Sequence, residues 1–169
     1  MRRRRVWGWV VACVLGLAAF VWTNWQHSFW FDRTSGYMTG TYKIAGVRVW
    51  SYAEPTRVSE MLGSTYDETT ADRRFVGSSF FGGVACGRGG PYMVHCSRAA
   101  EAIGQIDGSE GKARLLREVM TRLDEVLSRN WGTAVVFERE NGSRSIVARG
   151  ADGEFLFRVS ASDTPNPAE

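Results

Sequence analysis

An uncharged, apolar stretch near the N-terminus constrains this chain more than any other feature. It covers residues 6–26 and directly follows four consecutive arginines, Arg2, Arg3, Arg4 and Arg5. A helix rises about 1.5 Å per residue, so about 20 apolar residues cross the roughly 30 Å hydrocarbon core of a bilayer. The sequence therefore predicts a transmembrane helix at residues 6–26, with residues 1–5 as a basic cap on its cytoplasmic side.

Two groups of tryptophan mark the ends of this stretch. Indole rings favour the headgroup boundary, because they join an apolar body to a hydrogen-bond donor. Basic residues beside a span stay in the cytoplasm, so the arginines predict a cytoplasmic N-terminus and a C-terminal domain that is periplasmic or extracellular. The expected location is the cell (inner) membrane, crossed once, and the first expected partner is membrane lipid. The predicted membrane-interface residues are Trp7, Trp9, Trp22, Trp25 and Trp30.

Two alternatives remain open for this segment. A basic start followed by an apolar run is also the signature of a cleaved signal peptide. A cut after Ala19 would place Leu17 where a small residue is favoured, and bulky Phe20 would follow the cut, so the cleavage site is poor. The second alternative is a helix buried inside a soluble domain.

The distribution of charge argues against a nucleic-acid partner. The chain has 21 Lys and Arg residues against 18 Asp and Glu, a net charge of +3. Because four of the basic residues lie in the N-terminal cap, the rest of the chain has fewer basic than acidic residues. It also lacks the basic stripe that follows a phosphate backbone. We therefore expect no nucleic acid among the partners.

The segment after the span mixes aromatic and polar residues. We expect residues 27–40 to form a juxtamembrane linker that lies along the membrane interface. Clustered Trp and Phe are favoured at protein interfaces, so Phe29, Trp30 and Phe31 are candidate contacts for another membrane subunit. Arg88, which we expect at the tip of a later glycine-rich loop, is a further candidate contact.

Residues 41–162 are expected to form an extracytoplasmic α+β domain. Residues 41–52 alternate around Ala45 and Gly46, which predicts either a strand with a bulge or a hairpin. Pro55 and Gly63 are typical of the start and the end of a short helix. Two apolar runs within residues 75–94 predict two strands, joined by a loop at residues 87–90 whose glycines adopt positive φ.

The last third of the chain gives the clearest pattern. Residues 109–129 place apolar side chains on one helical face and Glu/Arg pairs on the other. Residues 133–138, 145–149 and 154–160 predict a three-strand antiparallel meander, since Asn-Gly and Asp-Gly at the two turns favour tight hairpins. The predicted class is α+β, an antiparallel sheet packed by one main helix. Residues 163–169 read as a disordered tail.

Cys86 and Cys96 are the cysteines outside the apolar stretch. In an oxidising compartment an even pair is usually bridged, so a disulfide between them is predicted. A plain hairpin at residues 87–90 would pair Cys86 with Pro91 instead, so the bridge requires an irregular loop. His95 and Cys96 are adjacent and would point to opposite faces of a strand, so no metal site is predicted.

No motif in the chain indicates catalysis or a cofactor. C-x-x-C, G-x-S-x-G and the Walker pattern are all missing from the sequence. The sequence therefore favours a non-enzymatic, membrane-anchored protein with a protein-binding domain, an accessory or assembly subunit of a larger membrane or envelope complex. One alternative is a module that binds a small ligand or an envelope polymer, and a second is an extracytoplasmic hydrolase.

Overall fold

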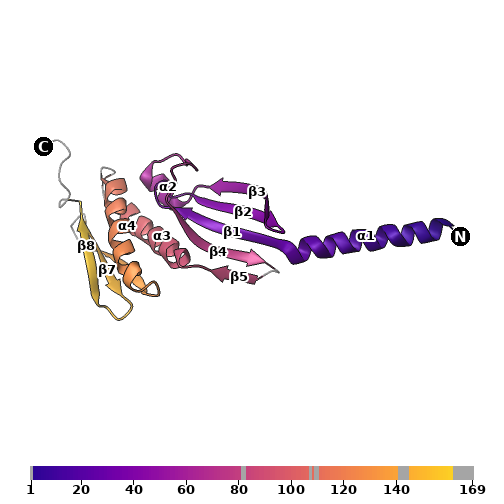
Figure 1. Ribbon diagram of the computed structural model, residues 1–169. Helices are drawn as coiled ribbons and strands as arrows, with labels where there is room; N and C mark the ends of the chain where they lie inside the picture. The colour runs from indigo at the N-terminus through magenta and orange to yellow at the C-terminus, as the bar shows by residue number, and fades with distance from the viewer. Residues whose placement is uncertain (1, 81–82, 107, 109–110, 141–144, 162–169) are drawn as a thin grey trace.

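The first element is a long apolar helix that stands apart from the rest of the protein. The computed structural model describes residues 2–80, 83–106, 108, 111–140 and 145–161. Helix α1 (Arg2–Asn24) projects from the folded domain as a single rod (Figure 1). Its segment Val6–Asn24 has a mean hydropathy of 2.0 and none of it is buried against the domain. This length and composition fit a membrane anchor or a signal sequence, whereas a helix buried in a soluble domain does not fit.

The chain passes from α1 into a sheet without an intervening residue. Strand β1 (Trp25–Asp32) is the central strand of a five-stranded antiparallel sheet with the order β3-β2-β1-β4-β5. The linker expected at residues 27–40 is therefore wrong, because these residues form β1 and the start of β2 (Met38–Ile44). The helix also ends earlier than residue 26, since Trp25 and Gln26 belong to β1.

Two hairpins complete this sheet. Strand β3 (Val47–Glu54) pairs with β2, and the turn between them places Ala45 at φ 49° and Gly46 at φ 81°. Two consecutive residues in the left-handed region are typical of the tight turns that join antiparallel strands. The sequence left a bulged strand and a hairpin open at this point, and the structure has the hairpin. Strands β4 (Arg73–Phe80) and β5 (Gly83–Cys86) form the second hairpin.

The part of the chain that the structure describes contains three helices besides α1. Helix α2 (Arg57–Leu62) ends at Gly63, as predicted, and α4 (Lys112–Arg129) confirms the strongest helical pattern in the sequence. Helix α3 (Gly89–Gly104) was not predicted, and the expectation of a strand after residue 90 is wrong. Its buried residues recur at helical spacing, because Tyr92, Cys96 and Ile103 all face the core.

A second sheet contains the C-terminal meander. Strands β6 (Val135–Arg139), β7 (Ser145–Gly150) and β8 (Phe155–Ser160) are antiparallel in the order β6-β7-β8, which confirms the predicted meander. Gly153 has a φ of 84° in the turn between β7 and β8, as an Asp-Gly turn requires. The Asn141-Gly142 turn, residues 109–110 and the predicted disordered tail at 163–169 lie outside the described residues.

Helices α3 and α4 lie between the two sheets. Figure 1 shows α3 and α4 covering the end of the five-stranded sheet that is far from α1, with the meander on their other side. One core extends through all three layers, from Phe31 in β1 through Leu116 in α4 to Ile146 in β7. The α+β class is thus confirmed, with a second sheet and a second long helix. Among the described residues, none forms a layer over the end of the five-stranded sheet next to α1.

Candidate functional site

The uncovered end of the five-stranded sheet presents a continuous group of aromatic rings. Alternate side chains of a strand share one face, and the strand register places residues of β1, β2 and β3 side by side. The ring of His27 stacks on that of Tyr42, with centroids 3.9 Å apart, and Tyr42 stacks on Trp50 at 5.4 Å. We call this surface the aromatic face, and its residues are Trp25, His27, Phe29, Tyr42, Trp50 and Tyr52.

The aromatic face extends from the central strand β1 to the edge strand β3. Trp50 is 61% exposed, although it lies against Tyr42. The hydroxyl of Tyr52 lies 3.2 Å from Nε2 of His27, two strands away. This contact requires Gly40 between them, because a Cβ at that position would fall 2.6 Å from the imidazole. The face is therefore a packed, ordered surface.

His27 is held without charge in this group of rings. Burial lowers its pKa from the ordinary value of 6.5, and the same cause lowers the pKa of His95 in α3. Both imidazoles are less than a tenth exposed. Protonation of either one would place a charge on a buried imidazole, which is unfavourable.

We expect stability to fall when the pH decreases from 7.5 to 5.0. A histidine with a depressed pKa keeps its full contribution above pH 6.5 and loses it as the pH falls toward the lower folded pKa, because the unfolded chain then takes up more protons. The melting temperature of the full chain in detergent checks this. His27→Phe keeps a ring but does not titrate, so the variant is expected to lose less stability than the parent. An equal loss in both would show that His27 titrates normally in the folded protein.

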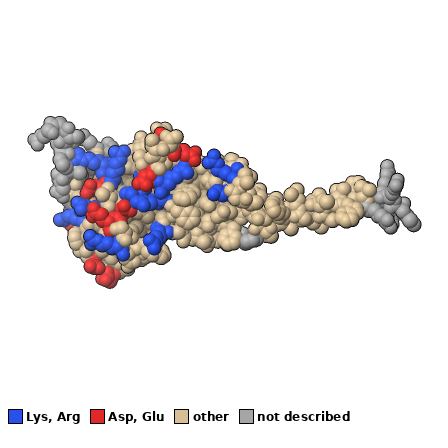
Figure 2. All heavy atoms as spheres, viewed as in Figure 1, with Lys and Arg blue, Asp and Glu red and all other residues tan. Residues whose placement is uncertain are grey.

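Apolar residues also lie at the hairpin ends beside α1. Val47 in β3 and Val84 in β5 are 66% and 69% exposed, and Phe80 in β4 is about half exposed. The register pairs Ile44 with Trp25, the first residue after α1, so the β2–β3 turn reaches the level of the helix end. Figure 2 shows that α1 carries an uncharged surface from Val6 to Asn24, whereas blue and red atoms gather over the domain.

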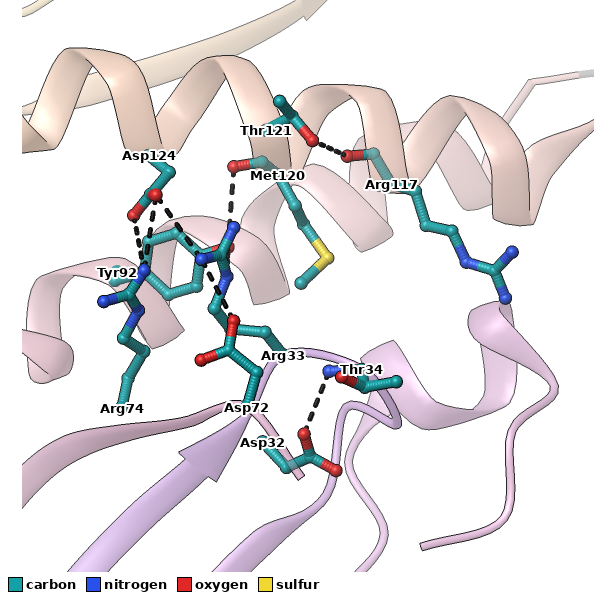
Figure 3. A network of polar contacts seen from close by, with 10 residues as sticks. All are labelled: Asp32, Arg33, Thr34, Asp72, Arg74, Tyr92, Arg117, Met120, Thr121 and Asp124. Carbon is teal, nitrogen blue, oxygen red and sulfur yellow. Dashed lines mark hydrogen bonds and ion pairs between the residues drawn. The ribbon is translucent and has the colours of Figure 1, made fainter. Parts of the chain in front are cut away.

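A network of charged side chains joins the five-stranded sheet to the helices (Figure 3). One guanidinium nitrogen of Arg33 lies 3.2 Å from Asp72 and 3.4 Å from Asp124 of α4, while Nε donates to the Tyr92 hydroxyl at 3.1 Å. Arg74 of β4 contacts the same Asp124 carboxylate at 3.2 Å. These ion pairs hold α3 and α4 against the end of the sheet, so the network has a structural role.

A pocket of about 430 Å³ opens beside this network, between the start of α3 and the end of α4. Its floor contains the buried Tyr92 and Leu127, and its rim contains the exposed Trp131. Arg74, Arg88 and Arg129 all line it, and Asp124 is its carboxylate. Arg88, expected at the tip of a strand-to-strand loop, instead precedes α3 and faces this pocket.

Only one member of the predicted Phe29, Trp30 and Phe31 patch lies on the aromatic face. Phe29 is on it, whereas Trp30 points to the opposite face and packs edge-on against Phe75, at 5.2 Å between centroids. Phe31 is fully buried, and its ring lies 6.3 Å from that of Tyr92 in α3. The expectation that Phe31 meets a partner is wrong, because α3 covers that end of the strand.

The predicted membrane residues fall in two places. Trp7, Trp9 and Trp22 are exposed along α1, while Trp25 and Trp30 are half-buried in β1. The arginines at positions 2–5 begin α1. Two of the five tryptophans that the sequence assigned to the membrane interface therefore lie in the five-stranded sheet.

The predicted disulfide is absent, and both cysteines are free thiols. Cys86 is exposed at the end of β5, whereas Cys96 is fully buried in α3. Gly90 lies next to Cys86, and Cys96 follows it by six helical residues, about 9 Å along the axis. Bridged cysteines have Cα atoms about 4.4–6.8 Å apart, so the unexpected helix separates the pair.

Cys96 is also unsuited to nucleophilic or metal chemistry. Burial raises the pKa of its thiol to about 12, so the sulfur keeps its proton at neutral pH. No group of three or more His, Cys, Asp or Glu side chains that could hold a metal ion occurs among the described residues.

No protein-family model, curated protein or solved structure matches this chain.

Proposed function

We propose that this protein is a membrane-anchored accessory or assembly subunit whose extracytoplasmic domain binds another membrane or envelope protein through the aromatic face. In this proposal α1 crosses the cell (inner) membrane once, with its N-terminus in the cytoplasm. The arginines that precede the span support this orientation. The observation that carries the proposal is the stack of His27, Tyr42 and Trp50, which begins at the buried His27 and ends at the exposed Trp50 on the surface of the sheet.

The chemistry of the aromatic face supports a protein partner. Trp and Tyr are enriched among the residues that contribute most to protein binding, since they bury a large area and lose few rotamers. All six residues of the face are without formal charge when His27 is neutral. A partner that covers them therefore buries no unpaired charge on this face. Its complement is an apolar protein surface that lies close to the membrane.

The height of the aromatic face above the membrane favours a protein over lipid as its binding partner. Strand β1 starts directly after α1, so Trp25 lies at the membrane boundary in this orientation. Phe29 and its neighbour Tyr52 lie four residues further along the strand, about 13 Å higher. Lipid would therefore meet the hairpin ends at Val47 and Val84, while the upper part of the face is left for a protein.

Photo-crosslinking from two neighbouring positions tests this proposal. A photoreactive phenylalanine analogue at Trp50 points from the aromatic face, and the same analogue at the exposed Ser51 points from the opposite face. Irradiation of native membranes should give one discrete heterologous adduct from position 50 and much less of it from position 51. The adduct is identified by mass spectrometry, and the same protein should co-purify with the unmodified chain in mild detergent.

Three outcomes would contradict the proposal. Equal adducts from positions 50 and 51 would show that the aromatic face is not the contact surface, and an adduct of twice the chain mass would make it a contact between two copies. A reporter that is active only outside the cytoplasm, fused to the C-terminus, serves as the topology control. A cytoplasmic C-terminus would remove the membrane orientation on which the partner assignment depends.

A further inference from the structure

The arginines that line the pocket beside α3 outnumber the carboxylates that line it. The two carboxylates nearby, Asp72 and Asp124, are already engaged by Arg33 and Arg74, at distances of 3.2–3.4 Å. That group of four side chains is neutral as a whole. Arg88 and Arg129 line the same pocket and form no ion pair within the part of the chain that the structure describes. Two guanidinium groups thus face one cavity without a counter-charge.

We propose that this pocket binds an oxyanion, a phosphate or carboxylate group carried by a small molecule or by a segment of an anionic polymer. Arg88 and Arg129 would neutralise the charge from two sides. Guanidinium groups suit this task because their planar N–H donors match the oxygens of phosphate and carboxylate. Arg88 directly precedes α3, so the positive end of that helix dipole acts in the same direction.

The remaining lining fits the uncharged part of such a ligand. Trp131 is half exposed at the rim and offers an indole face for a ring, while Leu127 and Tyr92 form an apolar floor. Asp124 lies between its two arginine partners, so its charge is compensated before an anion arrives. A cavity of about 430 Å³ falls in the range of about 300–1,000 Å³ that small-molecule sites occupy.

With α1 in the membrane orientation proposed above, on which this step rests, the position of the pocket excludes the membrane headgroups as its ligand. Arg74 lines the pocket and lies six residues from Phe80, whose end of β4 is beside α1. Six residues of an extended strand span about 20 Å, so the pocket faces the space beyond the headgroup region. The ligand is therefore soluble or belongs to a polymer of the envelope.

Calorimetric titration of the full chain in detergent tests this site. The probes are inorganic phosphate, glycerol 1-phosphate and citrate, in a buffer without other oxyanions. At least one of them should bind, more weakly as salt rises, and the Arg88→Ala/Arg129→Ala double variant should lose about tenfold or more in affinity. Arg122→Ala is the matched control, because Arg122 lies on α4 but is paired with Glu118 away from the pocket.

The probes also identify the group that is bound. Tighter binding of the two phosphates assigns a phosphate ligand, and tighter binding of citrate assigns a carboxylate. Trp131→Ala should weaken an organic probe more than inorganic phosphate. An equal loss of affinity in the double variant and in Arg122→Ala would overturn the site, as would the absence of binding by all three probes at low salt.

Discussion

Replacement of Phe31 by alanine is expected to lower the free energy of unfolding by about 3–5 kcal/mol, the usual cost of removing a buried aromatic ring. The Phe31 side chain is fully buried and belongs to the core that connects the sheet with the helix layer. Its loss leaves a cavity beside Tyr92, whose ring cannot move freely because its hydroxyl is bound by Arg33. Urea unfolding of the full chain in detergent, followed by circular dichroism, measures the change.

An exposed phenylalanine provides the control for this measurement. Phe155 in β8 is 57% exposed, so Phe155→Ala should change the free energy of unfolding by no more than about 0.5 kcal/mol. If Phe31→Ala proved as mild as Phe155→Ala, Phe31 would be a surface residue and the sequence-based assignment to a partner contact would stand.

The case of Phe31 shows what sequence alone could not resolve where α1 meets the sheet. The apolar N-terminal helix was predicted correctly, because a long apolar run is a property of local composition. The orientation indicated by the arginines stays a prediction. The strand at residues 25–32 was not, because its aromatic residues follow the span directly and fit an interfacial segment equally well. What separates Phe29 from Phe31 is the position of α3, which packs on one end of the strand and leaves the other bare.

The C-terminal half was predicted well where periodicity and turns agreed. Helix α4 and strands β6 to β8 have strong sequence patterns, and the sequence has Gly-containing dipeptides between the strands, signals that need no distant partner. Helix α3 was missed because its start is rich in glycine and contains Pro91, residues that suggest a loop. Its buried residues Cys96, Ala99 and Ile103 do follow a helical period, which was the available signal. The pocket was not predicted either, because Arg88 and Arg129 come close together only when α3 lies beside α4.

The glycines at the start of α3 allow close packing, and they do not serve the positive φ that the sequence indicated. Positive φ was expected at residues 87–90, yet neither Gly89 nor Gly90 adopts it. Gly89 is required instead because a Cβ there would fall on the carbonyl group of Phe75, 2.6 Å from its carbon. The helix thus begins in direct contact with the backbone of β4.

Gly89→Ala is accordingly expected to cost about 3 kcal/mol or more, the upper range for overpacking, because the obstacle is backbone and cannot rotate away. Gly104→Ala, at the other end of the same helix, meets no atom within 4 Å and should leave stability unchanged or raise it by up to about 1 kcal/mol. The same urea unfolding compares them. Equal stability of the two variants would mean that α3 can shift away from β4. Since Arg88 precedes Gly89 directly, such a shift would also move Arg88, so the proposed oxyanion site and the stability of this contact depend on the same glycine.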